Sequence, residues 1–180
     1  QACRYIGRHD YARCVVFHSL SKRSNLPGLR SGFVAGDATL IADFLKFRTY
    51  HGSSMSLPVQ KASIAAWNDE DHTVENRELY RQKFTAVTQI LNGYLDFPEP
   101  NASFYLWAKT PIDDIEFARE LYASKNITLL PGQFLSRPSN NYNPGQNRIR
   151  MALVAETTEC IEAALRIKDF ISSFKDKRDA

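Results

Sequence analysis

The chain has 180 residues, with 23 lysines and arginines against 20 aspartates and glutamates, and its formal charge at neutral pH is +3. Hydrophobic residues make up 43% and charged residues 24%, as in globular domains and unlike disordered, collagenous or coiled-coil chains. The best apolar run, residues 14–17, is far shorter than a membrane span, and basic residues are interspersed with acidic ones, so we expect neither a membrane anchor nor a nucleic-acid partner.

Short apolar runs alternate with polar loops in the first part of the chain. Residues 14–17 predict a short buried strand, and residues 29–36 predict a second strand after a Pro-Gly turn. We then expect a helix capped by Thr39 and ending near Phe47, a loop over residues 49–54 and a helix over residues 57–67.

The most helix-like segment spans residues 73–94, because its apolar side chains recur at spacings of four and three. Beyond it the pattern predicts a compact α+β layer with helices on one face of a few strands. The expected strands cover residues 104–108, 127–130 and 148–154, the helices cover 115–124 and 158–174, and a polar loop covers 136–146. We therefore divide the chain into residues 1–72, a connecting helix over 73–96 and a small α+β domain over 97–180.

Cysteine and histidine spacing gives no sign of a disulfide framework or a metal site. The histidines lack ligand spacing, and no CxxC pair is present. An odd number of cysteines cannot all pair within one chain, which favours a reducing compartment, and we expect a cytoplasmic protein. The three cysteines are Cys3, Cys14 and Cys160.

The loop after the first strand carries a hydroxyl and two cations, Ser19, Lys22 and Arg30, within twelve residues. This combination suits a phosphate group, because arginine offers a planar fork of donors and serine a short hydroxyl donor. On spacing alone, a solvated basic loop is the simpler interpretation. The Walker-type phosphate loop is absent.

The order of residues in this loop carries a family resemblance. Residues 17–32, FHSLSKRSNLPGLRSG, resemble the pyridoxal-phosphate lysine region of class I/II aminotransferases, which are fold type I enzymes. The resemblance continues through residues 50–52, 104–107, 130–132 and 148–154, and so covers essentially the whole chain. Within the family, SLSKRSN and ASFYLWAKTP are most similar to the succinyldiaminopimelate transaminases of bacterial lysine biosynthesis.

The resemblance implies an α/β chain that forms the C-terminal part of a PLP-dependent transferase fold. Residues 1–72 would form the edge of the large-domain sheet, and residues 97–180 the small α+β domain. It also implies a homodimer, because the family builds each active site at a subunit interface. The family's pyridine-pairing aspartate and several other cofactor contacts lie upstream of the lysine, so the chain resembles the C-terminal half of an enzyme about twice as long. We expect this half alone to be inactive.

The same resemblance assigns roles to the loop residues. Lys22 would hold the cofactor aldehyde as an imine and then carry a proton, a role that requires a primary amine. Ser19 and Arg30 would bind the cofactor phosphate. Arg23 follows the lysine without a role in the family, and we interpret it as a surface charge.

A second candidate site lies on the strand predicted over residues 148–154. Alternation places Arg148 and Arg150 on one face and the apolar Ile149 and Met151 on the other. An arginine is suited to bidentate capture of a carboxylate, and periodicity alone does not distinguish the two arginines. The resemblance favours Arg150 as the residue that binds the substrate α-carboxylate.

The expected activity is therefore pyridoxal 5′-phosphate-dependent transamination of amino acids and 2-oxo acids. The resemblance points to N-succinyl-LL-2,6-diaminopimelate with the 2-oxoglutarate/glutamate pair. A lyase or synthase of the same fold is one alternative, because these enzymes share the same elements. The other alternative is a non-catalytic α+β domain that binds a phosphorylated ligand or a protein partner.

Overall fold

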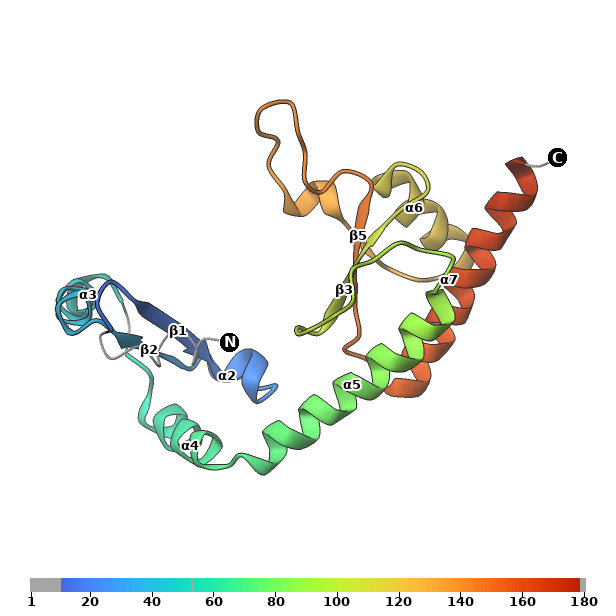
Figure 1. Ribbon diagram of the computed structural model, residues 1–180. Helices are drawn as coiled ribbons and strands as arrows, with labels where there is room; N and C mark the ends of the chain where they lie inside the picture. Colours follow the sequence, from blue (N-terminus) through green and yellow to red (C-terminus); the bar gives the residue numbers. More distant parts are fainter. Residues whose placement is uncertain (1–10, 53, 179–180) are drawn as a thin grey trace. The chain divides into compact units, whose positions relative to one another are not determined.

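The computed structural model describes residues 11–52 and 54–178. The chain forms two units that divide between Arg77 and Glu78, inside the long helix α5, Asp71–Leu91 (Figure 1). This position falls within the segment expected to be a connecting helix.

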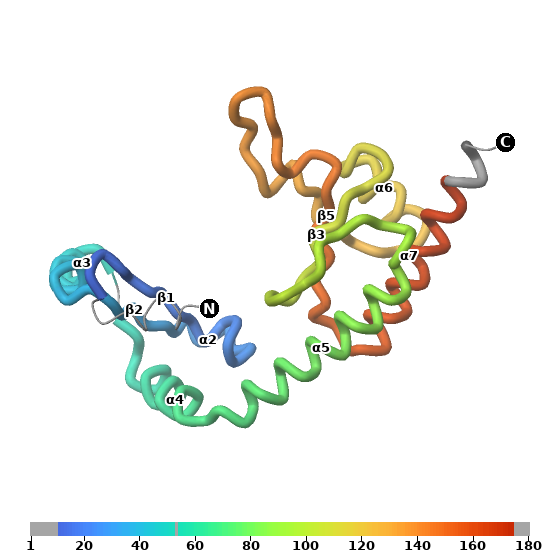
Figure 2. The backbone as a smooth tube through the Cα atoms, viewed as in Figure 1, coloured from blue at the N-terminus to red at the C-terminus, as the bar shows by residue number. Residues whose placement is uncertain are grey.

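The first unit contains a two-stranded antiparallel sheet and short helices. Strand β1, Val15–Ser19, pairs with β2, Gly32–Gly36, so that Ser19 lies opposite Gly32. Between them lie the four-residue helix α2, Leu20–Arg23, and the 3₁₀ turn η1, Pro27–Leu29. Helices α3, Ala38–His51, and α4, Leu57–Asn68, follow (Figure 2).

Strand β1 was predicted to be buried, and this is wrong for the described residues. Phe17 is 69% exposed and Phe33 on β2 is 47% exposed, because β1 and β2 pair only with each other. Helix α3 also differs from expectation. Its cap is Asp37, whose carboxylate accepts from the N–H groups of Thr39 and Leu40, and the helix includes residues 49–51, which were expected to be loop.

Helix α4 matches the predicted segment, and its aromatic end contacts the hairpin. The Trp67 ring lies 5.0 Å from the Phe33 ring and 5.5 Å from the His18 ring, between centroids. A hydrogen bond of 2.7 Å between the hydroxyls of Ser63 and Ser31 joins the same elements in the interior. These aromatic and polar contacts help to hold the hairpin of the first unit against α4.

The second unit is a three-stranded antiparallel sheet with helices over one face. Strand β5, Arg148–Ala152, lies in the centre between β3, Tyr105–Lys109, and the short β4, Leu130–Pro131 (Figure 1). Helices α6, Asp114–Lys125, and α7, Thr157–Arg178, pack on the sheet with the second half of α5. The core is formed by one face of the strands and the apolar stripes of these helices: Val87, Leu91, Leu106, Ala108, Phe117, Leu121, Ile149, Met151, Ala164, Ile167, Phe170 and Ile171.

Periodicity predicted α5, α6 and α7 to within about one helical turn at either end. The strand expected over residues 127–130 is mostly wrong, because only Leu130 and Pro131 pair with β5. Ile127 and Leu129 instead contribute side chains that pack against the core. The 3₁₀ turn η2, Gly132–Leu135, follows β4, and the polar loop after it projects away from the sheet (Figure 2).

Among residues 11–52 and 54–178, no helix is long and apolar enough to cross a membrane. The two cysteines within these ranges, Cys14 and Cys160, are free thiols, and burial raises the pKa of the Cys160 thiol. Cys3 lies outside the described residues.

Candidate active site

Ser19 marks the point where β1 turns into α2. Its hydroxyl oxygen accepts a hydrogen bond of 3.1 Å from the Ser21 N–H and so caps the first turn of α2. The same oxygen lies 3.2 Å from the carbonyl oxygen of Ser31, at the start of the returning strand. Leu20, which follows, is fully buried and fixes the helix to the unit. Ser19 therefore stands where the outgoing and returning segments meet.

Arg30 lies at the same end of the hairpin, just before β2. Its backbone is left-handed, with φ 50° and ψ 38°, a conformation uncommon for residues with a side chain. One guanidinium nitrogen donates to the carbonyl of Pro27 at 2.9 Å, and the side chain is exposed. Because Arg30 precedes Ser31, the turn brings its backbone next to the carbonyl that contacts Ser19.

Lys22 is exposed on α2, between the positions of Ser19 and Arg30 along the chain. The strand–helix–turn–strand unit therefore presents an amine, a hydroxyl and a guanidinium from a single hairpin connection. This donor set fits a phosphorylated aldehyde, because the hydroxyl and guanidinium can bind phosphate oxygens and the primary amine can bond to the aldehyde carbon. All three residues predicted to bind the cofactor lie in this one connection, and their roles stay predictions.

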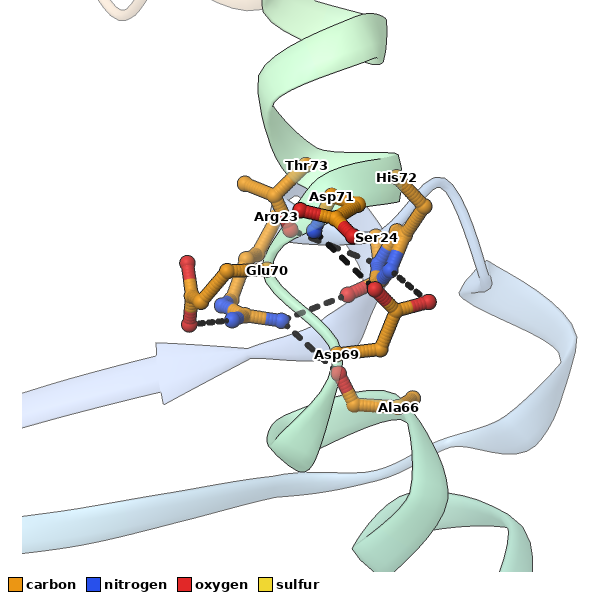
Figure 3. Close-up of polar contacts among 8 residues, drawn as sticks. All are labelled: Arg23, Ser24, Ala66, Asp69, Glu70, Asp71, His72 and Thr73. Atoms are coloured by element: carbon orange, nitrogen blue, oxygen red, sulfur yellow. Dashed lines mark hydrogen bonds and ion pairs between the residues drawn. The ribbon is translucent and has the colours of Figure 1, made fainter.

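Arg23 is not the surface charge predicted from the sequence. Its side chain is only 7% exposed and reaches the end of α4 (Figure 3). One guanidinium nitrogen donates to the Ala66 carbonyl at 3.0 Å and to the Ser24 hydroxyl at 3.1 Å, and the other pairs with Glu70. The guanidinium carbon also lies 4.9 Å from the centre of the Trp67 ring. The sequence signal that could have indicated this pairing is the acidic run at residues 69–71, which contains Glu70.

Arg150 lies in the central strand of the second unit, on the sheet face opposite the core. Its register partners are Trp107 on β3 and Leu130 on β4. The guanidinium carbon lies 4.6 Å from the Tyr105 ring centre and 5.3 Å from the Phe104 ring centre. A guanidinium attracted to aromatic rings in this way keeps N–H donors for other partners, which suits capture of a carboxylate.

The neighbourhood of Arg150 forms a recess of about 360 Å³, lined by Tyr105, Trp107, Leu135 and Arg150. No carboxylate of the described residues forms an ion pair with Arg150. The recess therefore combines aromatic walls with a cation that lacks a neutralising acid in this part of the chain. Such a site can bind an organic anion. The alternation predicted for this strand is confirmed, since Ile149 and Met151 are buried on the other face.

Two close contacts hold the wall of this recess. Gly132, at the start of η2, lies so near the backbone of Gly145 that a side chain at position 132 would come within 2.3 Å of the Gly145 carbonyl oxygen. A side chain there would also come within 2.8 Å of the Trp107 ring. The close approach of the two backbone segments therefore requires glycine at position 132. Leu135, at the end of the same 3₁₀ turn, lines the recess.

A buried carboxylate ties the same segments together. Asp114 is fully buried at the start of α6. One of its oxygens accepts from the Gln133 N–H at 3.0 Å, and the other accepts from the Gln133 side-chain amide at 2.7 Å and the Asn147 N–H at 2.8 Å. Asn147 directly precedes β5. Asp114 thus connects α6 to η2 and to the start of the strand that carries Arg150, a role that sequence reasoning missed.

We expect Asp114→Ala to lower the free energy of unfolding by about 3 kcal/mol, because it leaves buried amide donors without acceptors. Asp114→Asn is also expected to destabilise, since either orientation of the amide places an NH₂ group against an N–H donor. Urea denaturation measures both changes. Asp43→Ala, at an exposed site on α3, is the control and should shift unfolding by less than about 0.5 kcal/mol. Equal stability of Asp114→Ala and the control would contradict the role of Asp114.

Comparison with known proteins shows the family of the chain. The model of the family described as aminotransferase class I and II matches residues 4–167. The chain belongs to this family. Its members depend on pyridoxal phosphate. An aminotransferase structure from Neisseria meningitidis is similar at 52% identity and a TM-score of 0.86, over 94% of this chain and 43% of that one.

Curated relatives carry similar names. A probable aminotransferase of Mycobacterium tuberculosis is 36% identical over 87% of this chain and 36% of its own length. An LL-diaminopimelate aminotransferase of Nitratidesulfovibrio vulgaris is 34% identical over 85% of this chain and 39% of its own length. The structure of a probable N-succinyldiaminopimelate aminotransferase from Thermus thermophilus aligns at 28% identity and a TM-score of 0.79, covering 92% of this chain and 44% of that one.

The chain spans about two fifths of the length of these relatives. The fold expected from the sequence, the C-terminal part of a PLP-dependent transferase, is confirmed by these alignments. Within the described ranges, no group of three or more histidine, cysteine, aspartate or glutamate side chains could hold a metal ion.

Proposed function

We propose that this chain is the C-terminal part of a pyridoxal-phosphate-dependent aminotransferase and that it supplies four of the residues that act on cofactor and substrate. Lys22 is the covalent attachment point for the cofactor, Ser19 and Arg30 bind its phosphate, and Arg150 binds the substrate carboxylate. The observation that carries the proposal is the single hairpin connection that presents the amine, hydroxyl and guanidinium together, in a chain that belongs to this family.

The cofactor supplies an aldehyde that bonds to amines and a ring that accepts electrons from the substrate Cα. Binding, orientation and proton transfer fall to residues of this chain. The Lys22 amine, once displaced by substrate, takes up and returns a proton at Nζ. Arg30 offers several N–H donors besides the one used by Pro27, and these bind phosphate oxygens together with the Ser19 hydroxyl. Arg150 holds the substrate carboxylate, which orients the bond to be broken.

We further propose N-succinyl-LL-2,6-diaminopimelate as amino donor and 2-oxoglutarate as acceptor. Two kinds of support exist: the succinyldiaminopimelate-like segments of the sequence, and relatives named for diaminopimelate or its succinylated form. Diaminopimelate and its N-succinyl derivative both present an α-amino acid end, which the aromatic and cationic recess can accept. We also propose that the full-length protein is a cytoplasmic homodimer. The odd number of cysteines supports a reducing compartment, and aminotransferases of this family commonly form dimers.

The test uses the full-length protein that carries this chain, with pyridoxal phosphate and pairs of amino donors and 2-oxo acids. We expect glutamate to form from 2-oxoglutarate with N-succinyl-LL-diaminopimelate, more efficiently than with unmodified LL-diaminopimelate. Preference for the unmodified compound would overturn the proposed donor and leave transamination in place. Elimination products without a new amino acid would indicate a lyase. No reaction and no cofactor binding would favour a non-catalytic domain.

A further inference from the structure

Helix α2, which carries Lys22, is too short to be stable by itself. It has four residues, and a single helical turn fixes more backbone torsions than its one hydrogen bond repays. Its conformation therefore depends on contacts with the rest of the first unit. At its start these are the Ser19 cap and the buried Leu20 side chain. At its end the Leu20 carbonyl accepts from the N–H groups of Ser24 and Leu26, and the Arg23 side chain contacts α4 and the residues that follow it.

The Arg23 contacts converge on the C-terminal end of α4 and the residues that follow it (Figure 3). The Ala66 carbonyl belongs to the last turn of α4, where carbonyls lack partners within the helix, and Arg23 supplies the missing donor at 3.0 Å. Glu70, which is 67% exposed, neutralises the charge from the solvent side. The Trp67 ring lies beside the guanidinium at 4.9 Å and itself packs on the hairpin strands.

Neighbouring positions on a helix point in directions about 100° apart. Arg23 points into the unit, where only 7% of its side chain is exposed, while Lys22 is exposed. Fixing Arg23 therefore also fixes the direction in which Lys22 leaves the helix. A buried guanidinium keeps its place only when its donors are satisfied, so the contacts with Ala66, Ser24 and Glu70 act as one anchor.

We propose that Arg23 is a positioning residue for Lys22: it anchors α2 to the end of α4 and so sets where the lysine amine stands. The inference rests on the proposed function, because it takes Lys22 as the residue that captures the cofactor aldehyde. Arg23 itself is assigned no contact with cofactor or substrate. Arg23 affects the reaction only through the position and direction of the Lys22 side chain.

The test compares two cofactor forms on the full-length apoprotein. Pyridoxal phosphate needs the Lys22 amine for its covalent bond, whereas pyridoxamine phosphate has no aldehyde and binds only through its other contacts. The first readout is the rate of covalent capture, followed by absorbance and verified by borohydride trapping on the Lys22 peptide. The second readout is the Kd of pyridoxamine phosphate. A variant that displaces only the lysine should change the first and not the second.

We expect Arg23→Met to slow capture by roughly 10- to 100-fold, the effect of about 1 Å of misplacement, with the Kd of pyridoxamine phosphate unchanged within about two-fold. Arg23→Lys keeps the positive charge but lacks the planar N–H donors of the guanidinium, and it should recover part of the capture rate. Arg81→Met is the matched control, because Arg81 pairs with Glu78 at an exposed site on α5 and should leave both readouts unchanged.

Wild-type capture rates in both Arg23 variants would overturn the proposal. Equal losses in capture and in pyridoxamine phosphate binding would also overturn it, since they would indicate a general structural role. If Arg23→Met does not fold, Arg23→Lys decides between these outcomes. If the wild-type protein binds neither cofactor form, the proposed function itself fails, and this result is distinct from a defect limited to the Arg23 variants.

Discussion

Replacing Lys22 with alanine in the full-length protein is expected to remove the covalent bond to pyridoxal phosphate and to lower kcat for transamination by at least about 10²- to 10⁴-fold. This range is what loss of a positioned proton carrier alone removes. The loss of the amine as a nucleophile adds to it. The chain offers no adjacent substitute on α2, since the next cation, Arg23, is buried and cannot form an imine.

The measurements are the absorption spectrum with added cofactor, borohydride trapping and the transamination rate. The wild-type protein should show a protonated-imine band that borohydride removes, and the variant should not. Lys46→Ala, at an exposed position on α3, is the matched control and should behave as wild type. A trapped cofactor on another lysine, with activity retained in Lys22→Ala, would show that the attachment point has been assigned wrongly.

Replacing Arg150 with methionine should lower kcat/KM for amino-acid donors by about 30- to 4,000-fold. This range corresponds to the roughly 2–5 kcal/mol lost when one partner of a hydrogen-bonded charge pair is truncated, at about 1.4 kcal/mol for each tenfold change. Methionine removes the guanidinium that lies by the Tyr105 and Phe104 rings but leaves an unbranched apolar side chain of similar length beside them. Arg150→Lys should recover little, because lysine cannot bind a carboxylate through two parallel bonds.

The Arg148→Met variant tests which of the two arginines binds the carboxylate, since sequence periodicity does not distinguish Arg148 from Arg150. Arg148 lies on the same strand face, opposite Lys109 on β3, whereas Arg150 lies opposite Trp107. We expect the kcat/KM of Arg148→Met to change by no more than a few-fold. An amine substrate without the α-carboxylate offers a second check, because its slow reaction should not depend on Arg150. A larger loss in Arg148→Met than in Arg150→Met would exchange the two assignments.

Local pattern predicted the elements whose burial follows a simple period. The apolar stripe of α7 and the alternation along β5 are both confirmed, because a helix or strand that covers a core must repeat its apolar residues at its own period. The order of residues around Lys22 and Arg30 likewise indicated the family that the comparisons confirm. The pattern was less reliable for β4, where only Leu130 and Pro131 pair with β5. The apolar residues before them predicted a strand that starts at residue 127.

What the sequence determined by itself is therefore the family, the main helices and strands, and the candidate residues Ser19, Lys22, Arg30 and Arg150. Only the tertiary structure showed that Arg23 is buried and that Asp114 connects three segments. Ala66 and Glu70, which bind Arg23, lie 43 and 47 residues away from it, and the partners of Asp114 lie 19 and 33 residues away. Sequence periodicity does not reveal a buried polar side chain of this kind. The free-energy cost of burying it is offset by hydrogen bonds to groups that come near it only when the chain folds.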